Sequence, residues 1–228
     1  MYEDALAIFD YLPIDAGSHS LYINHLWSAF EGLMEKGEPA QSFAILPFHL
    51  LFMFAVQYKV YRLSALNPAK YVAILGNSNL RDKTQLPALE VNPPIPDANG
   101  IISSTCSVVN LSILPEKYLF EFLKITEADD TLIERAKILV EIRGSYAHAN
   151  GNIEEDLELR INEYLDVLRD IQVSMAPVND LLADTWVGEI TPDETPNEFI
   201  QARLRDSYTC RADFADGKLA VSFGTILE

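Results

Sequence analysis

The stretch TLIERAKILVEIRGSYAHANGNIEEDLELRINEYLDVLRDI, residues 131–171, decides the fold of this chain. Its first part repeats apolar residues at helical spacing, namely Leu132, Ala136, Leu139 and Ile142. Its second part has the same spacing, with one side formed by Ile153, Leu157, Ile161, Leu165, Leu168 and Ile171. The stretch therefore predicts two amphipathic helices that pack as neighbours across a short turn.

The ends of these two helices carry capping signals. Thr131 and Glu134 form a capping box, which predicts the start of the first helix. The Ala-Asn-Gly sequence at residues 149–151 predicts its end, because glycine readily adopts the left-handed conformation of a helix C-cap. Asn152 and Glu155 predict the start of the second helix in the same way.

Helical patterns also dominate the upstream part of the chain. Ser18 or Ser20 predicts the cap of a helix that runs to about Lys36, where Gly37-Glu38-Pro39 breaks it. One face of this helix is expected to carry Tyr22, Leu26, Ala29, Phe30 and Leu33. A further helix contains the apolar run at residues 43–56 and ends near Asn67-Pro68, because the residue before proline disfavours the helical conformation.

The apolar run at residues 43–56 could be taken for a membrane span. It is shorter than the roughly twenty apolar residues that a spanning helix needs, and it contains Pro47 and His49. We therefore expect a central core helix and no membrane insertion. His49 is expected to be a buried histidine whose ring nitrogens have hydrogen-bond partners.

The remaining segments are less regular. Residues 76–100 are rich in proline and asparagine and predict an irregular excursion, whereas residues 101–114 fit either a strand or a short helix. Near the end, Thr195 predicts the start of a short helix, and Asp216-Gly217 predicts the turn of a β-hairpin. The predicted fold is mainly α, with a helical domain at residues 1–187 and a C-terminal extension at residues 188–228.

The composition limits the possible functions. The 228 residues include 17 Lys and Arg against 34 Asp and Glu, so the formal net charge is −17. This charge repels polyanions at long range and disfavours a surface that binds nucleic acid throughout, although a local basic cleft remains possible. Cys106 and Cys210 form no metal-spaced pair, and the N-terminal residues lack a secretory signal, so a reducing cytoplasm is expected. The chain has neither a P-loop nor a G-x-S-x-G motif.

Residues 142–151, Ile-Arg-Gly-Ser-Tyr-Ala-His-Ala-Asn-Gly, combine two side chains that can act on RNA. Arg143 stays charged and can bind two phosphate oxygens in a planar fork, and His148 can exchange protons near neutral pH. Such a pair could promote attack of a 2′-hydroxyl on the adjacent phosphate without a metal or other cofactor. Residues five apart on a continuous helix point about 140° away from each other. The pair can therefore share a site only if the helix ends between them or if a twofold axis joins two chains.

This motif, an arginine followed after four residues by a histidine between two helices, resembles the R-x(4–6)-H signature of HEPN domains. The resemblance implies a small helical bundle that commonly dimerises, and a metal-independent ribonuclease of a toxin, CRISPR-associated or antiviral system. Gly144 departs from the polar residue, often asparagine, that many catalytic members have there. Asn150 stands where one toxin subfamily has a tyrosine.

Further residues of this segment are candidates for supporting roles. Ser145, Tyr146 and Asn150 are candidates for contacts with the substrate. Glu141 is a candidate for substrate contact and for orienting Arg143. In a purely structural interpretation, Arg143 has a structural role and His148 ends its helix, where the dipole stabilises it without any catalytic role.

Three functions remain open from the sequence. The first is a HEPN-type endoribonuclease acting on single-stranded RNA or tRNA in bacterial defence or a toxin system. Here Arg143 binds the phosphate and His148 is the general acid and base. The second is a non-catalytic HEPN-like module that forms a homodimer and binds a protein partner such as an antitoxin. The third is an acidic mimic that occupies a basic surface on another protein.

Overall fold

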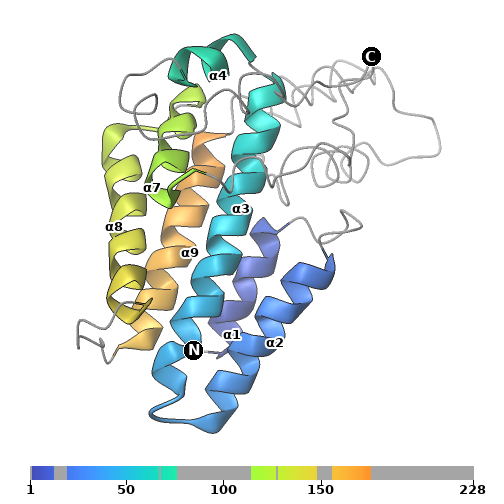
Figure 1. Ribbon diagram of the computed structural model, residues 1–228, viewed down its shortest axis with the longest axis vertical. Coiled ribbons are helices and arrows are strands. Elements are labelled where there is room, and N and C mark those ends of the chain that lie inside the picture. The colour runs from blue at the N-terminus through green and yellow to red at the C-terminus, as the bar shows by residue number, and fades with distance from the viewer. Residues whose placement is uncertain are drawn as a thin grey trace, which may run out of the picture.

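The computed structural model describes residues 2–12, 20–66, 68–75, 114–126, 128–147 and 156–175. Within these ranges the secondary structure is helical, with turns between the helices and no strand. The long helices of this part form a bundle (Figure 1), and they are α2 (Ser20–Lys36), α3 (Ile45–Leu66), α8 (Asp130–Ala147) and α9 (Leu157–Ser174). The prediction of a mainly α fold is confirmed. The predicted excursion at 76–100 and the extension at 188–228, with its β-hairpin, lie outside the described residues.

Short helical elements connect or flank the long ones. They are α1 (Tyr2–Ala5), η1 (Leu6–Tyr11), η3 (Gln41–Ala44), α4 (Pro68–Leu75), α7 (Glu116–Leu119) and η5 (Phe120–Ile125), where η marks a 3₁₀ helix. α3 ends at Leu66, as the Asn67-Pro68 signal predicted. The sequence pattern did not indicate α4, which begins at Pro68; proline is well suited to the first position of a helix because its missing N–H is not needed there.

Helix α3 lies at the centre of the bundle and packs against α2, α8 and α9 (Figure 1). In the described part of the chain, Gln41–Val60 is one stretch that is long and apolar enough to cross a membrane, but 78% of its most apolar window is buried inside the bundle. A helix that is apolar on most of its circumference must be covered on all sides. The prediction that this run forms a core helix is confirmed.

The buried face of α2 agrees in part with the predicted one. Phe30 is buried as predicted, and Leu26 and Leu33 are partly buried against the core. Tyr22 and Ala29 are exposed, and Ile23 and Trp27 are buried instead. The stripe is rotated by about one residue because the large indole of Trp27 packs against Phe9 and Phe30 in the core. The predicted helix end is confirmed: α2 stops at Lys36, and Gly37 adopts a positive φ of 66°, which glycine tolerates best.

The predicted face residues of α8 and α9 are buried or partly buried, except Ile153, which lies outside the described residues, and the two helices pack against each other. Their caps differ from the prediction. Asp129, not Thr131, accepts a hydrogen bond from the backbone N–H of Leu132 at 2.8 Å, and α8 already begins at Asp130. Asp156, not Asn152, caps α9 by accepting from the N–H of Leu159 at 2.9 Å. The capping-box predictions were therefore wrong.

Candidate functional site

Arg143 lies near the C-terminal end of α8 and is held by a carboxylate from another element. One terminal nitrogen, Nη2, donates to Oε2 of Glu116, the first residue of α7. The side chains are partly exposed, Arg143 to 26% and Glu116 to 24%. A guanidinium has five N–H donors. Among the described residues, no acceptor lies within hydrogen-bonding distance of the buried Nε of Arg143.

Glu116 also contacts a histidine from the centre of the bundle. The same Oε2 atom that accepts from Arg143 lies 3.3 Å from Nε2 of His49 on α3. The His49 side chain is fully buried, with an exposure of 0%. One carboxylate oxygen thus joins the partly exposed arginine to a buried imidazole.

The other ring nitrogen of His49 continues the chain of contacts to α9. Nδ1 lies 2.8 Å from the hydroxyl of Tyr164, and this hydroxyl donates to the backbone carbonyl of Leu139 on α8 at 3.1 Å. Tyr164 is fully buried. Both nitrogens of His49 have partners, so the prediction of a satisfied buried histidine is confirmed. We call Arg143, Glu116, His49 and Tyr164 the arginine network; its members come from four different helices.

Burial and charge together lower the pKa values of His49 and Glu116 and raise that of Tyr164. Burial lowers the pKa of the His49 imidazole, and the Arg143 charge lowers it further, although Glu116 opposes both. Burial alone would raise the pKa of Glu116, but the hydrogen bonds and charges of His49 and Arg143 outweigh it and lower that pKa. Burial raises the pKa of Tyr164. At neutral pH the network therefore holds an ionised carboxylate against a charged guanidinium, beside a neutral imidazole.

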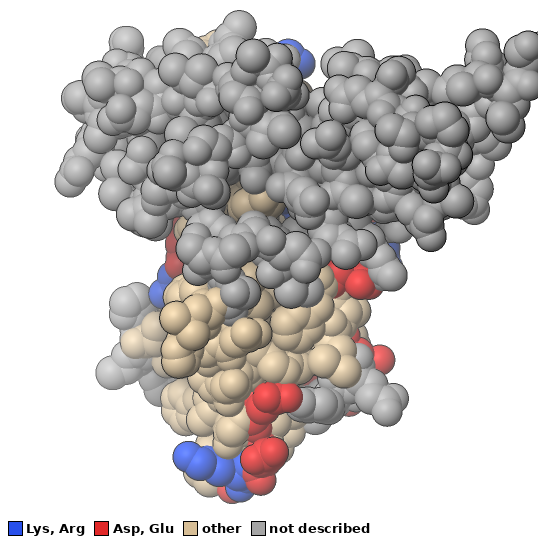
Figure 2. Space-filling model, turned by 90° about the vertical axis from the view of Figure 1, so that its right-hand side faces the viewer, with Lys and Arg blue, Asp and Glu red and all other residues tan. Residues whose placement is uncertain are grey.

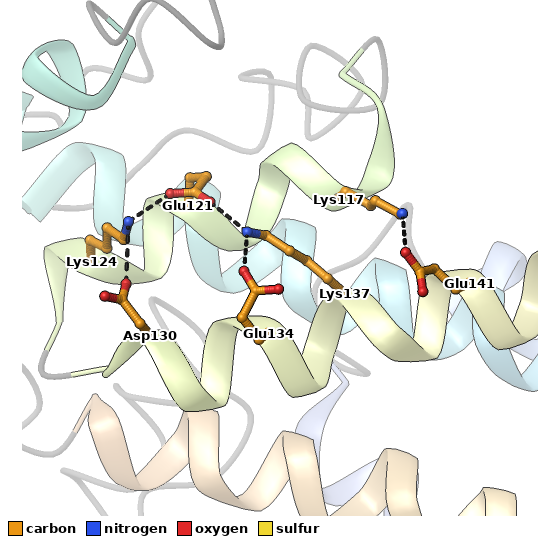
Figure 3. Close-up of polar contacts among 7 residues, drawn as sticks. All are labelled: Lys117, Glu121, Lys124, Asp130, Glu134, Lys137 and Glu141. Atoms are coloured by element: carbon orange, nitrogen blue, oxygen red, sulfur yellow. Dashed lines mark hydrogen bonds and ion pairs between the residues drawn. The ribbon is translucent and has the colours of Figure 1, made fainter.

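Ion pairs hold the segment that carries Glu116 along α8 (Figure 3). Lys117 of α7 pairs with Glu141 at 2.5 Å, and Glu121 of η5 pairs with Lys137 at 2.8 Å. Lys124 of η5 reaches Asp130 at the start of α8 at 3.4 Å. These contacts are spaced along α8 from Asp130 to Glu141. Together they keep the α7–η5 segment in register with α8, so that Glu116 lies beside Arg143.

The other predicted site residues have different environments. Glu141 pairs with Lys117, and the carboxylate on Arg143 is Glu116, so the expectation that Glu141 orients Arg143 is corrected. The hydroxyl of Ser145 donates to the carbonyl of Ile142 at 2.6 Å. Tyr146 is buried, at 7% exposure. His148 and Asn150 lie outside the described residues.

The position at which α8 ends decides how the side chains of Arg143 and His148 are oriented relative to each other. The helix continues through Gly144 to Ala147, so it does not end at Gly144. Arg143 therefore lies one turn inside the helix, and His148 follows directly after its last described residue. If the two side chains share a site within one chain, the helix must break immediately after Ala147.

Sequence patterns alone did not reveal Glu116. It is 27 residues from Arg143 and 67 residues from His49 in the chain, in a segment without a clear periodic pattern. Only the packing of α7 between α3 and α8 brings the three together. The preceding Pro115 was the one local signal for a helix start at this position.

Other candidate sites are less well formed. In the described part of the chain, no group of three or more His, Cys, Asp or Glu is placed to hold a metal ion. A hollow of about 210 Å³ between α8 and α9 is lined by residues that include Arg135 and Arg160. Both arginines are already paired, Arg135 with Asp170 and Arg160 with Glu163. His25 lies on the surface of α2.

No protein-family model, no curated protein and no solved structure matches this chain. The resemblance to HEPN domains therefore depends on residues 142–151 and the two helices that flank them.

Proposed function

We propose that this protein is a metal-independent endoribonuclease of the HEPN type, in which Arg143 binds the scissile phosphate and His148 transfers protons. The observation that supports the proposal best is the arginine network. It fixes Arg143 near the end of α8 while 26% of the arginine side chain stays exposed. An arginine held in one orientation can bind phosphate oxygens without losing further side-chain entropy.

The proposed reaction uses the RNA as its own nucleophile. The 2′-hydroxyl attacks the adjacent phosphorus, the bond to the 5′-oxygen breaks, and a 2′,3′-cyclic phosphate forms. His148 takes the proton of the 2′-hydroxyl or supplies the proton of the leaving 5′-oxygen, and Arg143 stabilises the charge on the phosphorane. A second histidine, contributed by a twofold-related chain, would perform the other proton transfer. A homodimer fits the separation of about 140° between helical residues five apart.

We place this activity in the cytoplasm, in bacterial defence or a toxin system, with RNA as the substrate. The strongly acidic chain, with a formal net charge of −17, repels RNA at long range. Two Arg143 and two His148 side chains in one cleft would supply local positive charge against this background. The acidity thus favours a short, specific contact over a broad nucleic-acid surface.

The proposal is tested by His148→Ala, compared with His25→Ala, in the presence of EDTA. His25 is an exposed histidine on α2 and provides a matched control. We expect wild type and His25→Ala to cut RNA at the same rate, and His148→Ala to be inactive although it still folds. General acid–base catalysis contributes about 10²–10⁴-fold to a rate, so the loss should be at least of this order. Cleavage at the wild-type rate by His148→Ala would refute the proposal.

A second candidate, a non-catalytic module that dimerises, is favoured by the surface of α2 and α3. The first eleven residues of α2, from Ser20 to Phe30, carry no charge. Leu21 is 66% exposed and Tyr22 44%, and Tyr22 contacts Phe54 of α3, one turn from the exposed Leu50. We call Leu21, Tyr22, Leu50 and Phe54 the α2–α3 patch. Figure 2 shows a largely uncharged surface on this side of the bundle. A patch of this kind in an acidic chain supports contact with a second copy.

A further inference from the structure

The buried part of the arginine network has a geometry that bears on the proposed reaction. Glu116 shares one oxygen between the guanidinium of Arg143 and Nε2 of His49. Any change in the proton state of His49 therefore changes how strongly that oxygen is drawn towards Arg143. No other carboxylate is recorded on Arg143 among the described residues.

The hydrogen-bond donors of the network can be counted. The hydroxyl of Tyr164 has one proton and two acceptors within reach, the Leu139 carbonyl at 3.1 Å and Nδ1 of His49 at 2.8 Å. When His49 is neutral with its proton on Nε2, it donates to Glu116, and Nδ1 accepts from Tyr164. When His49 is doubly protonated, Nδ1 donates to the Tyr164 oxygen, and the Tyr164 proton turns to Leu139. In both states the two ring nitrogens of His49 and the hydroxyl of Tyr164 are hydrogen-bonded, so this part of the network can exist in either.

The two states differ in their effect on Arg143. The groups that face His49 are Glu116 from α7, Tyr164 from α9 and Arg143 from α8. In the neutral state, Glu116 is balanced by a single cation, Arg143. In the protonated state, the same carboxylate lies between two cations, and the repulsion between His49 and Arg143 offsets part of the carboxylate's attraction for Arg143. The guanidinium is then held less firmly.

We propose that Glu116 and His49 are positioning residues for RNA cleavage: Glu116 fixes the guanidinium of Arg143, and His49 fixes Glu116 and, when protonated, weakens the hold of Glu116 on Arg143. The proposal rests on the proposed function of Arg143 as the phosphate-binding residue. Neither Glu116 nor His49 touches the RNA. Their effect is expected in the rate of the bound complex more than in the affinity for RNA, because a misplaced arginine still attracts the phosphate.

The first test is Glu116→Gln, which keeps the size of the side chain and removes its charge. Glu134→Gln is the control, since Glu134 pairs with Lys137 on the exposed side of the same helix as Arg143. We expect kcat to fall about 10²-fold in Glu116→Gln, the order of loss that a displacement of about 1 Å causes. KM should change little, and Glu134→Gln should cut RNA like wild type. Urea unfolding of each variant shows whether it is folded.

The second test is the pH–rate profile of His49→Gln, whose amide can still donate to Glu116 but cannot take up a proton. In wild type, the acid limb reflects protonation of both His148 and His49. In His49→Gln it should be less steep, because one of the two ionisations is absent. A merely structural role of His49 would lower the rate equally at every pH and leave the shape unchanged.

The outcomes separate this proposal from the proposed function. If His148→Ala is inactive while Glu116→Gln cuts at the wild-type rate, the positioning role is overturned and the nuclease stands. If Glu116→Gln does not fold, the acid limb of His49→Gln decides alone, and an unchanged limb overturns the role of His49. Cleavage at the wild-type rate by His148→Ala refutes the nuclease itself. A wild-type protein that cuts no RNA overturns both.

Discussion

At the scale of single residues, the central feature is one carboxylate, Glu116, that contacts both an arginine and a histidine. Glu116 binds a partly exposed arginine on one side and lies 3.3 Å from a fully buried histidine on the other. Removing one member of such a buried polar network leaves the others without partners, which is more harmful than replacing the whole network by apolar groups. Replacing Glu116 would therefore leave both Arg143 and His49 without this partner.

The buried imidazole makes stability depend on pH. Burial lowers the pKa of His49 in the folded protein, so the unfolded chain takes up a proton at a higher pH than the folded one. The free energy of unfolding should therefore fall as the pH decreases through the unfolded histidine value of about 6.5 and towards the folded pKa. His49→Gln should lose less stability between about pH 7.5 and 5. Urea unfolding at several pH values measures this, and parallel curves for the two proteins would contradict it.

The ionisation of Glu116 does not change the free energy of unfolding in this pH interval. Its pKa is lowered in the folded protein, so its contribution to stability is complete above the ordinary glutamate value and is lost only as the pH falls below it. That value, about 4.3, lies below the interval from about pH 7.5 to 5 in which the two proteins are compared. The comparison in that interval therefore reports on His49 and not on Glu116.

At the scale of elements, the capping residues of α8 provide a clear comparison. Asp129 accepts from the N–H of Leu132, whereas Thr131, the residue that the capping-box pattern selected, lies inside the helix. Asp129→Ala should lower the free energy of unfolding by about 1 kcal/mol, the usual loss for an N-cap. Thr131→Ala should have a much smaller effect, because no cap is removed. The reverse order of the two losses in urea unfolding would show that Thr131 is the cap.

The helices were predictable from the sequence, but their exact starts and one of their faces were not. The periodic apolar residues of α8 and α9 fix which side is buried, since only that side can face a core. The predictions of the N-cap residues were wrong because each helix start offers two suitable residues. Asp129 lies close to Thr131, and Asp156 close to Asn152, and all four are residue types that are preferred at N-caps. On α2, tertiary packing of Trp27 decided the register, and no local pattern carries that information.

The candidate site was predictable only in part, for a related reason. Arg143 was identified by its spacing from His148, and His49 was predicted to be buried and satisfied. Glu116 and Tyr164 reach them from distant segments, 67 and 115 residues from His49. Contacts at such separations depend on how helices pack, so sequence spacing cannot identify them.

At the scale of the whole molecule, the formal net charge of −17 bears on how two chains meet. Like charges oppose association, and an uncharged face reduces this opposition. The α2–α3 patch has this property, and its exposed apolar side chains supply the attractive term. Dimerisation through this face is the contact that the second candidate function requires.

The α2–α3 patch leads to a prediction about the oligomeric state. Wild type should sediment as a dimer, with twice the chain mass of 25.6 kDa. Leu21→Glu should shift it towards the monomer, because the new charge lies in the contact. Val173→Glu is the matched control: Val173 of α9 is 61% exposed, close to the 66% of Leu21, and lies outside the patch. A monomeric wild type, or equal dissociation of both variants, would show that the α2–α3 patch is not a dimer contact.

The most direct test of the central claim, that Arg143 and His148 cleave RNA without a metal, is the chemistry of the cut ends. Total bacterial RNA is incubated with wild-type protein and with Arg143→Ala in EDTA, and the 3′ ends of the fragments are identified. We expect fragments that end in a 2′,3′-cyclic phosphate from wild type and none from Arg143→Ala. Intact RNA with the wild-type protein, or the same cyclic ends at the same rate from Arg143→Ala, would contradict the claim.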